Sequence, residues 1–308
     1  MANPNRELRR LRDAALVAGF DLFESLRSRK VLVLLALYVA GAMAAAGGFV
    51  TMLHELEGTL AEALQVSATE KPGALTDALM ASEELRRVLA DMVGDEGLVD
   101  ALIKVPVLAL FYGWMAFTFV PALVTFTSCD AIAAEVSTGS SRFALFRAER
   151  ISWALGKLGG QAALMLVGIL GGALGTWIIG AGFLSGFSLA DHAWWLARLS
   201  VRAWWNGLPY LGLAMGVSLA TRTPNGARAL ALAGLIALGI GDSLLANDHV
   251  LEYAPVALST LRLLFPGGYT LDHWRPDILE RAPAMIMQLS LAIAYFSVGF
   301  ARFYRRDA

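Results

Sequence analysis

Histidines, aspartates and one glycine–lysine pair are the residues of this chain whose types could support chemistry. Three of the four histidines directly follow an aspartate, at His192, His249 and His273, and His54 stands apart. Imidazole and carboxylate groups can ligate transition metals. A protein zinc site usually has closely spaced ligands, and these residues are scattered over predicted loops. We therefore expect surface histidines and no metal site. No Ser-His-Asp pattern or pair of acids has a recognisable spacing, so we expect no catalytic site either.

Gly156-Lys157 is the only Gly-Lys dipeptide in the chain and is the only candidate for a phosphate-binding loop. Such a loop needs a second glycine five residues earlier and a serine or threonine after the lysine. Ile151 and Leu158 occupy those two positions. We therefore expect no cofactor in this chain, and any ATP hydrolysis must come from a separate polypeptide.

The composition is that of a membrane protein. Hydrophobic residues make up 57% of the chain and charged residues 17%, whereas soluble domains are about 25% charged. The net charge of -1 argues against a nucleic-acid partner, because neutralising phosphates requires a basic excess. The single cysteine, Cys129, excludes an internal disulfide, and we expect it to have a packing role.

Six apolar stretches approach the length of about 20 residues that a bilayer core requires. They are Val31–Met52, Val105–Thr127, Leu155–Phe183, Trp204–Ala220, Ala227–Ala246 and Pro283–Tyr304. The expected fold is therefore an all-α polytopic membrane protein with a six-span transmembrane domain over residues 31–308. Asp242 lies near the outer end of the fifth span. It could contact a substrate or a proton, but we favour a residue at the membrane interface beside Asn247 and Asp248.

Basic residues indicate the orientation of these spans. They gather in residues 1–30, in the connector 128–157, in the short link 221–228 and in the carboxyl-terminal tail. An even number of spans puts all four segments on one side, which the basic excess makes the cytoplasm of the inner (plasma) membrane. The acidic segment 53–104 is then outside. Its length predicts a small helical extracytoplasmic insert, in which Leu85, Val88, Leu89 and Met92 share one helical face.

Residues 1–30 have apolar side chains at helical spacing, with charged residues around the rest of the helix. These apolar residues are Leu8, Leu11, Ala15, Ala18, Leu22 and Leu26. The pattern predicts an interfacial helix that contacts membrane lipid; the alternative is a basic anchor that only fixes topology. Glycines also recur at four-residue spacing, in Gly156/Gly160, Gly168/Gly172, Gly171/Gly175 and Gly212/Gly216. We expect them to allow close helix packing within the chain rather than to form a dimer seam.

The connector 128–157 is unusually charged for so apolar a chain. Ser137 to Ser140, with the sequence STGS, predicts a break between two short helices. Phe143, Leu145 and Phe146 follow, beside Arg142, Arg147, Glu149 and Arg150. Aromatic residues flanked by charge suit a docking surface. The residue types fit a solvated loop equally well.

The order of residues in this connector resembles the cytoplasmic connector of type-2 ABC (ATP-binding cassette) transporter permeases. The matching residues are Glu135, Gly139-Ser140, Leu145-Phe146, Arg150 and Gly156-Lys157. The tail Phe303 to Ala308, an aromatic followed by Arg-Arg-Asp, also resembles the ending of this family. A proline that the family has before the arginine is missing, and Ala148 lies in that zone. The missing proline leaves the helix boundaries open.

The resemblance implies that the connector includes a coupling helix, which docks on a separate ABC ATPase subunit. The contact residues that it implies are Glu135, Arg142, Phe143, Phe146, Arg147 and Arg150. ATP and magnesium would bind that partner. The chain itself would be the permease subunit of an exporter and would pair with a second copy or with a paralogous permease.

Two other functions compete with this interpretation. A polytopic membrane enzyme would need polar residues clustered within its spans, where Asp242 is the main one. A non-transporting membrane assembly subunit would share the same topology. No pattern in the sequence identifies a transported substrate.

Overall fold

The computed structural model describes residues 4–64, 72–73, 82–83, 86–87, 90, 95–245, 247 and 255–305, and within them the fold is helical, without strands. The helices are α1 (Pro4–Arg27), α2 (Arg29–Leu64), α5 (Glu96–Ile103), α6 (Val107–Ser128), α7 (Ala131–Thr138), α8 (Ser140–Leu145), α9 (Arg150–Phe183), α10 (Leu189–Ala220), α11 (Pro224–Leu245), α13 (Pro255–Arg262) and α14 (Ile278–Tyr304). Two 3₁₀ turns, η1 (Pro266–Tyr269) and η2 (Leu271–Trp274), precede α14. The all-α class is confirmed.

Five helical segments of the described residues are long and apolar enough to cross a membrane. They contain α2, α6, α9, α11 and α14. Each coincides with one of the predicted spans, although the last residue of the fifth prediction, Ala246, lies outside the described residues. The fourth predicted span lies in α10, which is not among the five. The count of six therefore stays a prediction.

Helix α10 is the centre of the bundle and contacts α6, α9, α11 and α14. Its polar side chains Ser200, Asn206 and Ser218 are completely or almost completely buried. They face other helices and find hydrogen-bond partners there. These polar residues are therefore covered by the neighbouring helices of the bundle.

The paired glycines pack helices together within the chain, as expected. A Cβ at Gly156 would lie 2.6 Å from the Cβ of Val17 in α1, and one at Gly160 would lie 2.9 Å from the carbonyl of Ala18. Gly212 of α10 packs in the same way on the backbone of α14. The small residues thus bring backbones into contact. The prediction of close packing within the chain is confirmed.

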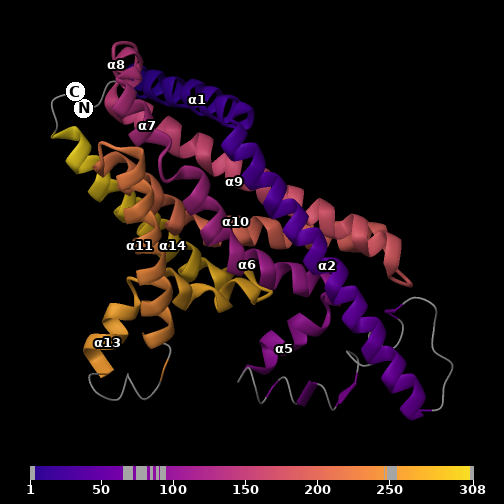
Figure 1. Cartoon of the computed structure of the whole chain (residues 1–308). Helices are drawn as coiled ribbons and strands as arrows, with labels where there is room; N and C mark the ends of the chain where they lie inside the picture. Colours follow the sequence, from indigo (N-terminus) through magenta and orange to yellow (C-terminus); the bar gives the residue numbers. More distant parts are fainter. Residues whose placement is uncertain are drawn as a thin grey trace.

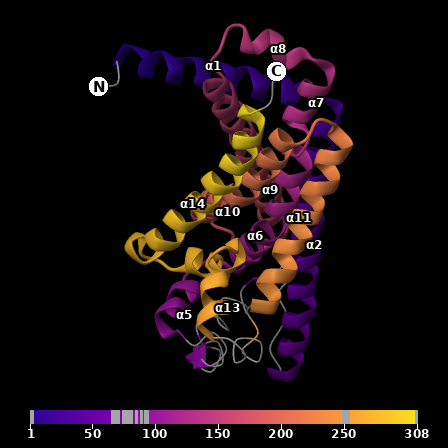
Figure 2. The same ribbon diagram turned by 90° about the vertical axis from the view of Figure 1, so that its left-hand side faces the viewer.

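Different helices lie at the two ends of the bundle (Figures 1 and 2). Helices α1, α7 and α8 and the carboxyl end of α14 lie together at one end, which we call the connector end. Helices α5 and α13 lie at the opposite end, here called the insert end. The connector between α6 and α9 and the amino-terminal helix α1, which are far apart in sequence, therefore share one surface.

The apolar stripe that the sequence predicts on α1 is packed in the second half of the helix and exposed in the first half. Leu22 and Leu26 pack against the buried residues around Leu35 in α2, whereas Leu8 and Leu11 are exposed. The division arises because the second half of α1 packs along α9, while its first half extends beyond the bundle (Figure 2). The exposed leucines are compatible with a membrane surface, and the interfacial position stays a prediction.

Pro72 and Gly73 of the insert are attached to the bundle by hydrogen bonds of their backbone groups. The Gly73 N–H donates to the carboxylate of Glu57 in α2, with an N–Oε1 distance of 2.9 Å. The Ser185 N–H, in the link between α9 and α10, donates to the Pro72 carbonyl over 2.8 Å. The predicted apolar face of Leu85, Val88, Leu89 and Met92 lies outside the described residues.

Candidate functional site

The connector forms two short helices that break at a glycine, as the sequence predicts. Helix α7 ends at Thr138, and Gly139 follows with φ 75°, a left-handed conformation that favours glycine. Helix α8 begins immediately at Ser140. The chain therefore turns sharply at Gly139, and α8 lies at the tip of the connector end (Figure 1).

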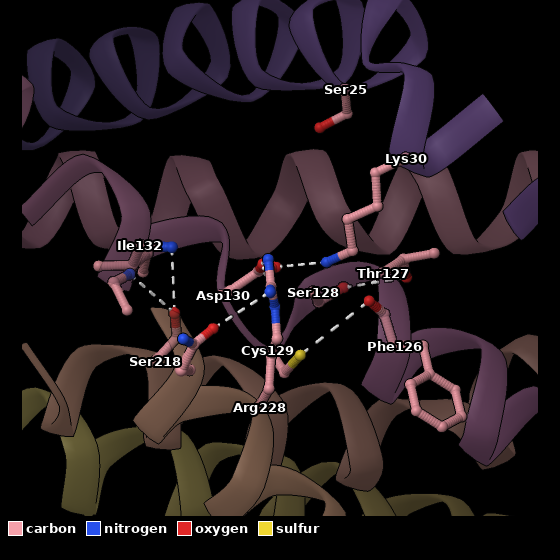
Figure 3. Close-up of polar contacts among 12 residues, drawn as sticks. Ser25, Lys30, Phe126, Thr127, Ser128, Cys129, Asp130, Ile132, Ser218 and Arg228 are labelled. Carbon is pink, nitrogen blue, oxygen red and sulfur yellow. Dashed lines mark hydrogen bonds and ion pairs between the residues drawn. The ribbon is translucent and has the colours of Figure 1, made fainter. Parts of the chain in front are cut away.

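The first turn of α7 is held by a side chain of the central helix α10. The backbone N–H groups of Ile132 and Ala133 both donate to Ser218 Oγ, each over 3.0 Å (Figure 3). Ser218 is fully buried. Helix termini leave backbone donors that need partners, and Ser218 supplies one from a different helix. The start of the connector is therefore fixed to α10.

Asp130, just before α7, joins the connector to two more helices. One carboxylate oxygen accepts from Lys30 Nζ of α2 over 2.6 Å. The other accepts from Nε and Nη2 of Arg228 in α11, over 2.8 and 2.5 Å (Figure 3). Asp130 is buried. Because one buried carboxylate takes two cations, the connector, α2 and α11 are electrostatically linked.

Lys157 of α9 is the centre of a second buried network. Its Nζ lies 2.6 Å from Oδ1 of Asp21 in α1 and also pairs with Glu135 in α7. Gln161, one turn further along α9, donates to the other oxygen of Asp21 over 2.8 Å and accepts from Ser128 Oγ over 3.0 Å. The side chains of Lys157 and Asp21 are 5% and 4% exposed. This network joins α1, α6, α7 and α9.

The six residues predicted to contact the ATPase separate into two groups. Glu135 pairs inward with Lys157. Arg150 donates from Nη1 to the Tyr304 carbonyl of α14 over 3.0 Å. Arg142, Phe143, Phe146 and Arg147 are exposed. Much of the connector's charge is thus paired with other helices of this chain, and contact of the six residues with an ATPase stays a prediction.

We call the four exposed residues Arg142, Phe143, Phe146 and Arg147 the α8 surface. Phe143 is 76% exposed and Phe146 is 86% exposed. The opposite side of α8 packs inward, with Ser141 buried and Leu145 against the main core. Two uncovered phenylalanines on a fixed short helix are typical of an interaction surface. Beside it, Glu149 pairs with Arg10 of α1, with Oε2 and Nε 2.6 Å apart.

Sequence reasoning missed most partners of these networks. No motif in the sequence marks the partners Asp21, Lys30, Gln161, Ser218 and Arg228. One signal was present: Lys157 and Gln161 are four residues apart, so they share a helical face. No local pattern connects that face to Asp21, which is 136 residues away from Lys157 in sequence.

The histidines do not form a site among the described residues, where no three potential metal ligands come together. His249 and Asp248 lie outside that part of the chain. The expectation of surface histidines is wrong for His273, which is 1% exposed. Its ring lies 2.6 Å from Gln288 Oε1 and stacks near Phe117, and burial lowers the pKa of its imidazole.

Asp242 has a role in local structure. Its Oδ2 accepts from the Gly267 N–H over 3.0 Å, which fixes the turn η1 against α11. This contact explains why a carboxylate lies near the end of an apolar helix without invoking a substrate. Asp248, which the sequence places near Asp242, lies outside the described residues.

Comparison with known protein families decides the class. A family model described as "ABC-2 family transporter protein" matches residues 15–308. The chain belongs to the ABC-2 transporter family. The family that the connector and the tail resemble is thus confirmed, and the match covers nearly the whole chain. A search of the curated proteins found no match. As an ABC-2 family member with several apolar helices, the chain is a multi-pass membrane protein and a permease component of an ABC transporter.

Proposed function

We propose that this ABC-2 family chain is the permease subunit of an exporter, driven by a separate ABC ATPase that docks on the α8 surface. ATP and magnesium bind the ATPase in this proposal. The observation that carries it is the contrast within the connector. Asp130, Glu135 and Lys157 are paired inside the bundle, whereas Phe143 and Phe146 are left uncovered at its tip.

The buried networks give this surface a mechanical connection to the transmembrane helices. Asp130 links the connector to α2 and α11, and Lys157 links it to α1. A force applied to α8 by a moving ATPase would therefore be transmitted to several helices at once. In this proposal the networks are the coupling element, and the α8 surface is the contact.

We further propose that α10 is the sixth span and that the connector end is cytoplasmic. The burial of α10 at the centre of the bundle supports the first point, because a helix covered by protein tolerates polar residues within the membrane. The basic residues of the connector end support the second. Both termini would then lie in the cytoplasm and α5 outside the plasma membrane.

The orientation can be tested by cysteine labelling. Single cysteines at Ser140 and Glu96 are made in a Cys129→Ser background, since both positions are exposed. On intact cells, an impermeant thiol reagent should label Glu96→Cys, whereas Ser140→Cys should react only after permeabilisation. Labelling of Ser140→Cys on intact cells, with Glu96→Cys protected, would mean that the orientation is inverted.

The proposed pathway lies between two copies of this chain, or between it and a paralogous permease. Helices α2 and α11 support a second copy, because they are the least buried of the five apolar segments. They also border an apolar cavity of about 550 Å³ lined by Val33 and Leu232. Closed two-fold pairs are the commonest assemblies of identical chains.

The mass of the native complex tests this assembly and the separate ATPase together. After co-expression with a cognate ABC ATPase, the expected complex contains two permease chains of 33.0 kDa each and two ATPase chains. The purified complex should hydrolyse ATP, and the permease purified alone should not. ATP-driven transport by a strictly monomeric permease would refute the paired arrangement, and ATP hydrolysis by the isolated permease would refute the separate ATPase.

A further inference from the structure

Three arginines lie close together at the insert end of α10 and α14. Arg198 and Arg202 are one turn apart on α10, and Arg281 lies in the first turns of α14. The two helices are held together nearby, because Trp205 Nε1 donates to the Met285 carbonyl over 2.9 Å. Arg202 lies three residues before Trp205 and Arg281 lies four residues before Met285, so each arginine is about one helical turn from that contact. The three side chains therefore create one shared region of positive charge.

Arg202 is buried, and no carboxylate pairs with it among the described residues. It is 6% exposed. Its Nη1 donates to the His273 carbonyl over 2.9 Å, and its Nε has no acceptor within the described part of the chain. A guanidinium group cannot give up its proton in a protein to escape this situation. Burying a charge without an opposite charge is strongly unfavourable, so an anion beside Arg202 would relieve a real cost.

The other two arginines also lack carboxylate partners within the described residues. Arg198 Nη2 donates to the Pro276 carbonyl over 3.2 Å, and its guanidinium lies 5.1 Å from the Trp195 ring. Arg281 Nε donates to the Asp277 carbonyl over 3.1 Å. The Asp277 carboxylate also acts on Arg281, but one of its oxygens caps α14 at the Leu279 N–H. Both arginines are half-buried and retain donors for a ligand.

A fourth arginine at the same end provides a contrast. Arg275 pairs with Asp95 over 3.2 Å, with Asp272 over 3.2 Å and with Glu280 over 3.8 Å. These three acids are therefore already engaged by Arg275. Within the described residues, no ion pair involves Arg198, Arg202 or Arg281, and the one carboxylate that acts on Arg281 is that of Asp277, which also caps α14.

We propose that Arg198, Arg202 and Arg281 bind the phosphate group of an anionic ligand at the insert end. The planar fork of a guanidinium matches the oxygens of a phosphate, often with two parallel hydrogen bonds. The position fits a membrane boundary, because the apolar half of α10 starts at about Trp204. The phosphate could belong to a phospholipid headgroup or to a soluble phosphate ester. The site does not depend on the ATPase interaction proposed above.

Ligand-dependent stabilisation of the purified protein tests this site. The permease in a neutral detergent is titrated with short-chain phosphatidylglycerol or with glycerol 3-phosphate, and its thermal midpoint is followed. A ligand that binds only the folded state raises the midpoint. The wild type should respond to at least one of the two probes. Arg202→Gln, and the triple change with Arg198→Gln and Arg281→Gln, should weaken the apparent affinity about tenfold or more, the factor that one lost charged contact typically produces.

The controls separate a binding site from a structural role. Arg275→Gln removes an arginine at the same end that is already paired with acids of this chain. The Arg275→Gln variant should therefore respond to the probes as the wild type does. Arg202→Gln without a ligand should be no less stable than the wild type, because the change removes an unpaired buried charge. The single variant therefore stays usable even if the triple variant does not fold.

The two probes distinguish the source of the phosphate. A response to phosphatidylglycerol alone identifies a lipid headgroup, and a response to glycerol 3-phosphate as well identifies a site open to soluble phosphate esters. An equal response of the wild type and Arg202→Gln to the same probe would overturn the proposal. The absence of any response of the wild type to both probes would overturn it as well.

Discussion

Lys157→Met is expected to lower the stability of the permease by about 3–5 kcal/mol, which is the usual cost of removing one partner from a buried ion pair. The Asp21 carboxylate is 4% exposed and that of Glu135 is 24% exposed. Without Lys157, these two acids keep no cation within the network. Methionine fills a similar volume, so the effect reports the lost charge rather than a cavity.

The measurement is the thermal midpoint of the purified permease, together with its yield in membranes. The matched control is Arg142→Met on the exposed α8 surface, which should change stability by less than about 0.5 kcal/mol. A compensating variant sharpens the test. Adding Asp21→Asn and Glu135→Gln to Lys157→Met removes the stranded charges and should restore much of the stability, since residues in one network are strongly coupled. Equal midpoints for Lys157→Met and Arg142→Met would show that the network contributes little.

The pairing of Lys157 with Asp21 joins residues that are 136 positions apart in the chain. Contacts of this kind have no local sequence pattern, so only part of the structure could be predicted from the sequence. The apolar spans were predictable, because a lipid environment imposes a length and a composition on each helix independently. The break at Gly139 was predictable from local turn chemistry. The paired glycines of α9 and α10 indicated close packing. In each of these cases the decisive residues are neighbours in the chain.

The partners of Glu135 and Arg150 within the chain were not predictable in the same way. Their partners, Lys157 and the Tyr304 carbonyl, depend on how α7, α9 and α14 pack in three dimensions. The sequence pattern around Glu135 fits an exposed acid equally well. Helix α10 illustrates the same limit, because the burial of its polar side chains depends on which neighbouring helices cover them. The burial of His273 likewise follows from Phe117 and Gln288, which come from different helices.

The α8 surface is expected to supply most of the binding energy for the ATPase. Interface energy concentrates in a few aromatic and arginine anchors, which cost about 2 kcal/mol or more each when truncated. Phe146 is 86% exposed, and Arg147 is exposed beside it. Phe146→Ala combined with Arg147→Ala should therefore weaken ATPase binding by more than tenfold, since about 1.4 kcal/mol corresponds to a factor of ten. Folding should be unaffected, because neither side chain packs inside the bundle.

A matched control removes the same two residue types, one aromatic residue and one arginine, at the insert end. Trp194 is 65% exposed and Arg87 is exposed, so Trp194→Ala with Arg87→Ala also removes one aromatic residue and one arginine. Both double variants should have the thermal midpoint of the wild type. Any difference between them in ATPase binding then reports the location of the contact rather than a general loss of stability.

The most direct test of the account is the amount of ATPase that co-purifies with each permease variant at matched expression. The account predicts that Phe146→Ala/Arg147→Ala loses about nine-tenths or more of the bound ATPase at ATPase concentrations well below the dissociation constant of the wild type, while Trp194→Ala/Arg87→Ala retains as much as the wild type. Equal retention by the two double variants would contradict it and would show that α8 is only a solvated turn between two spans.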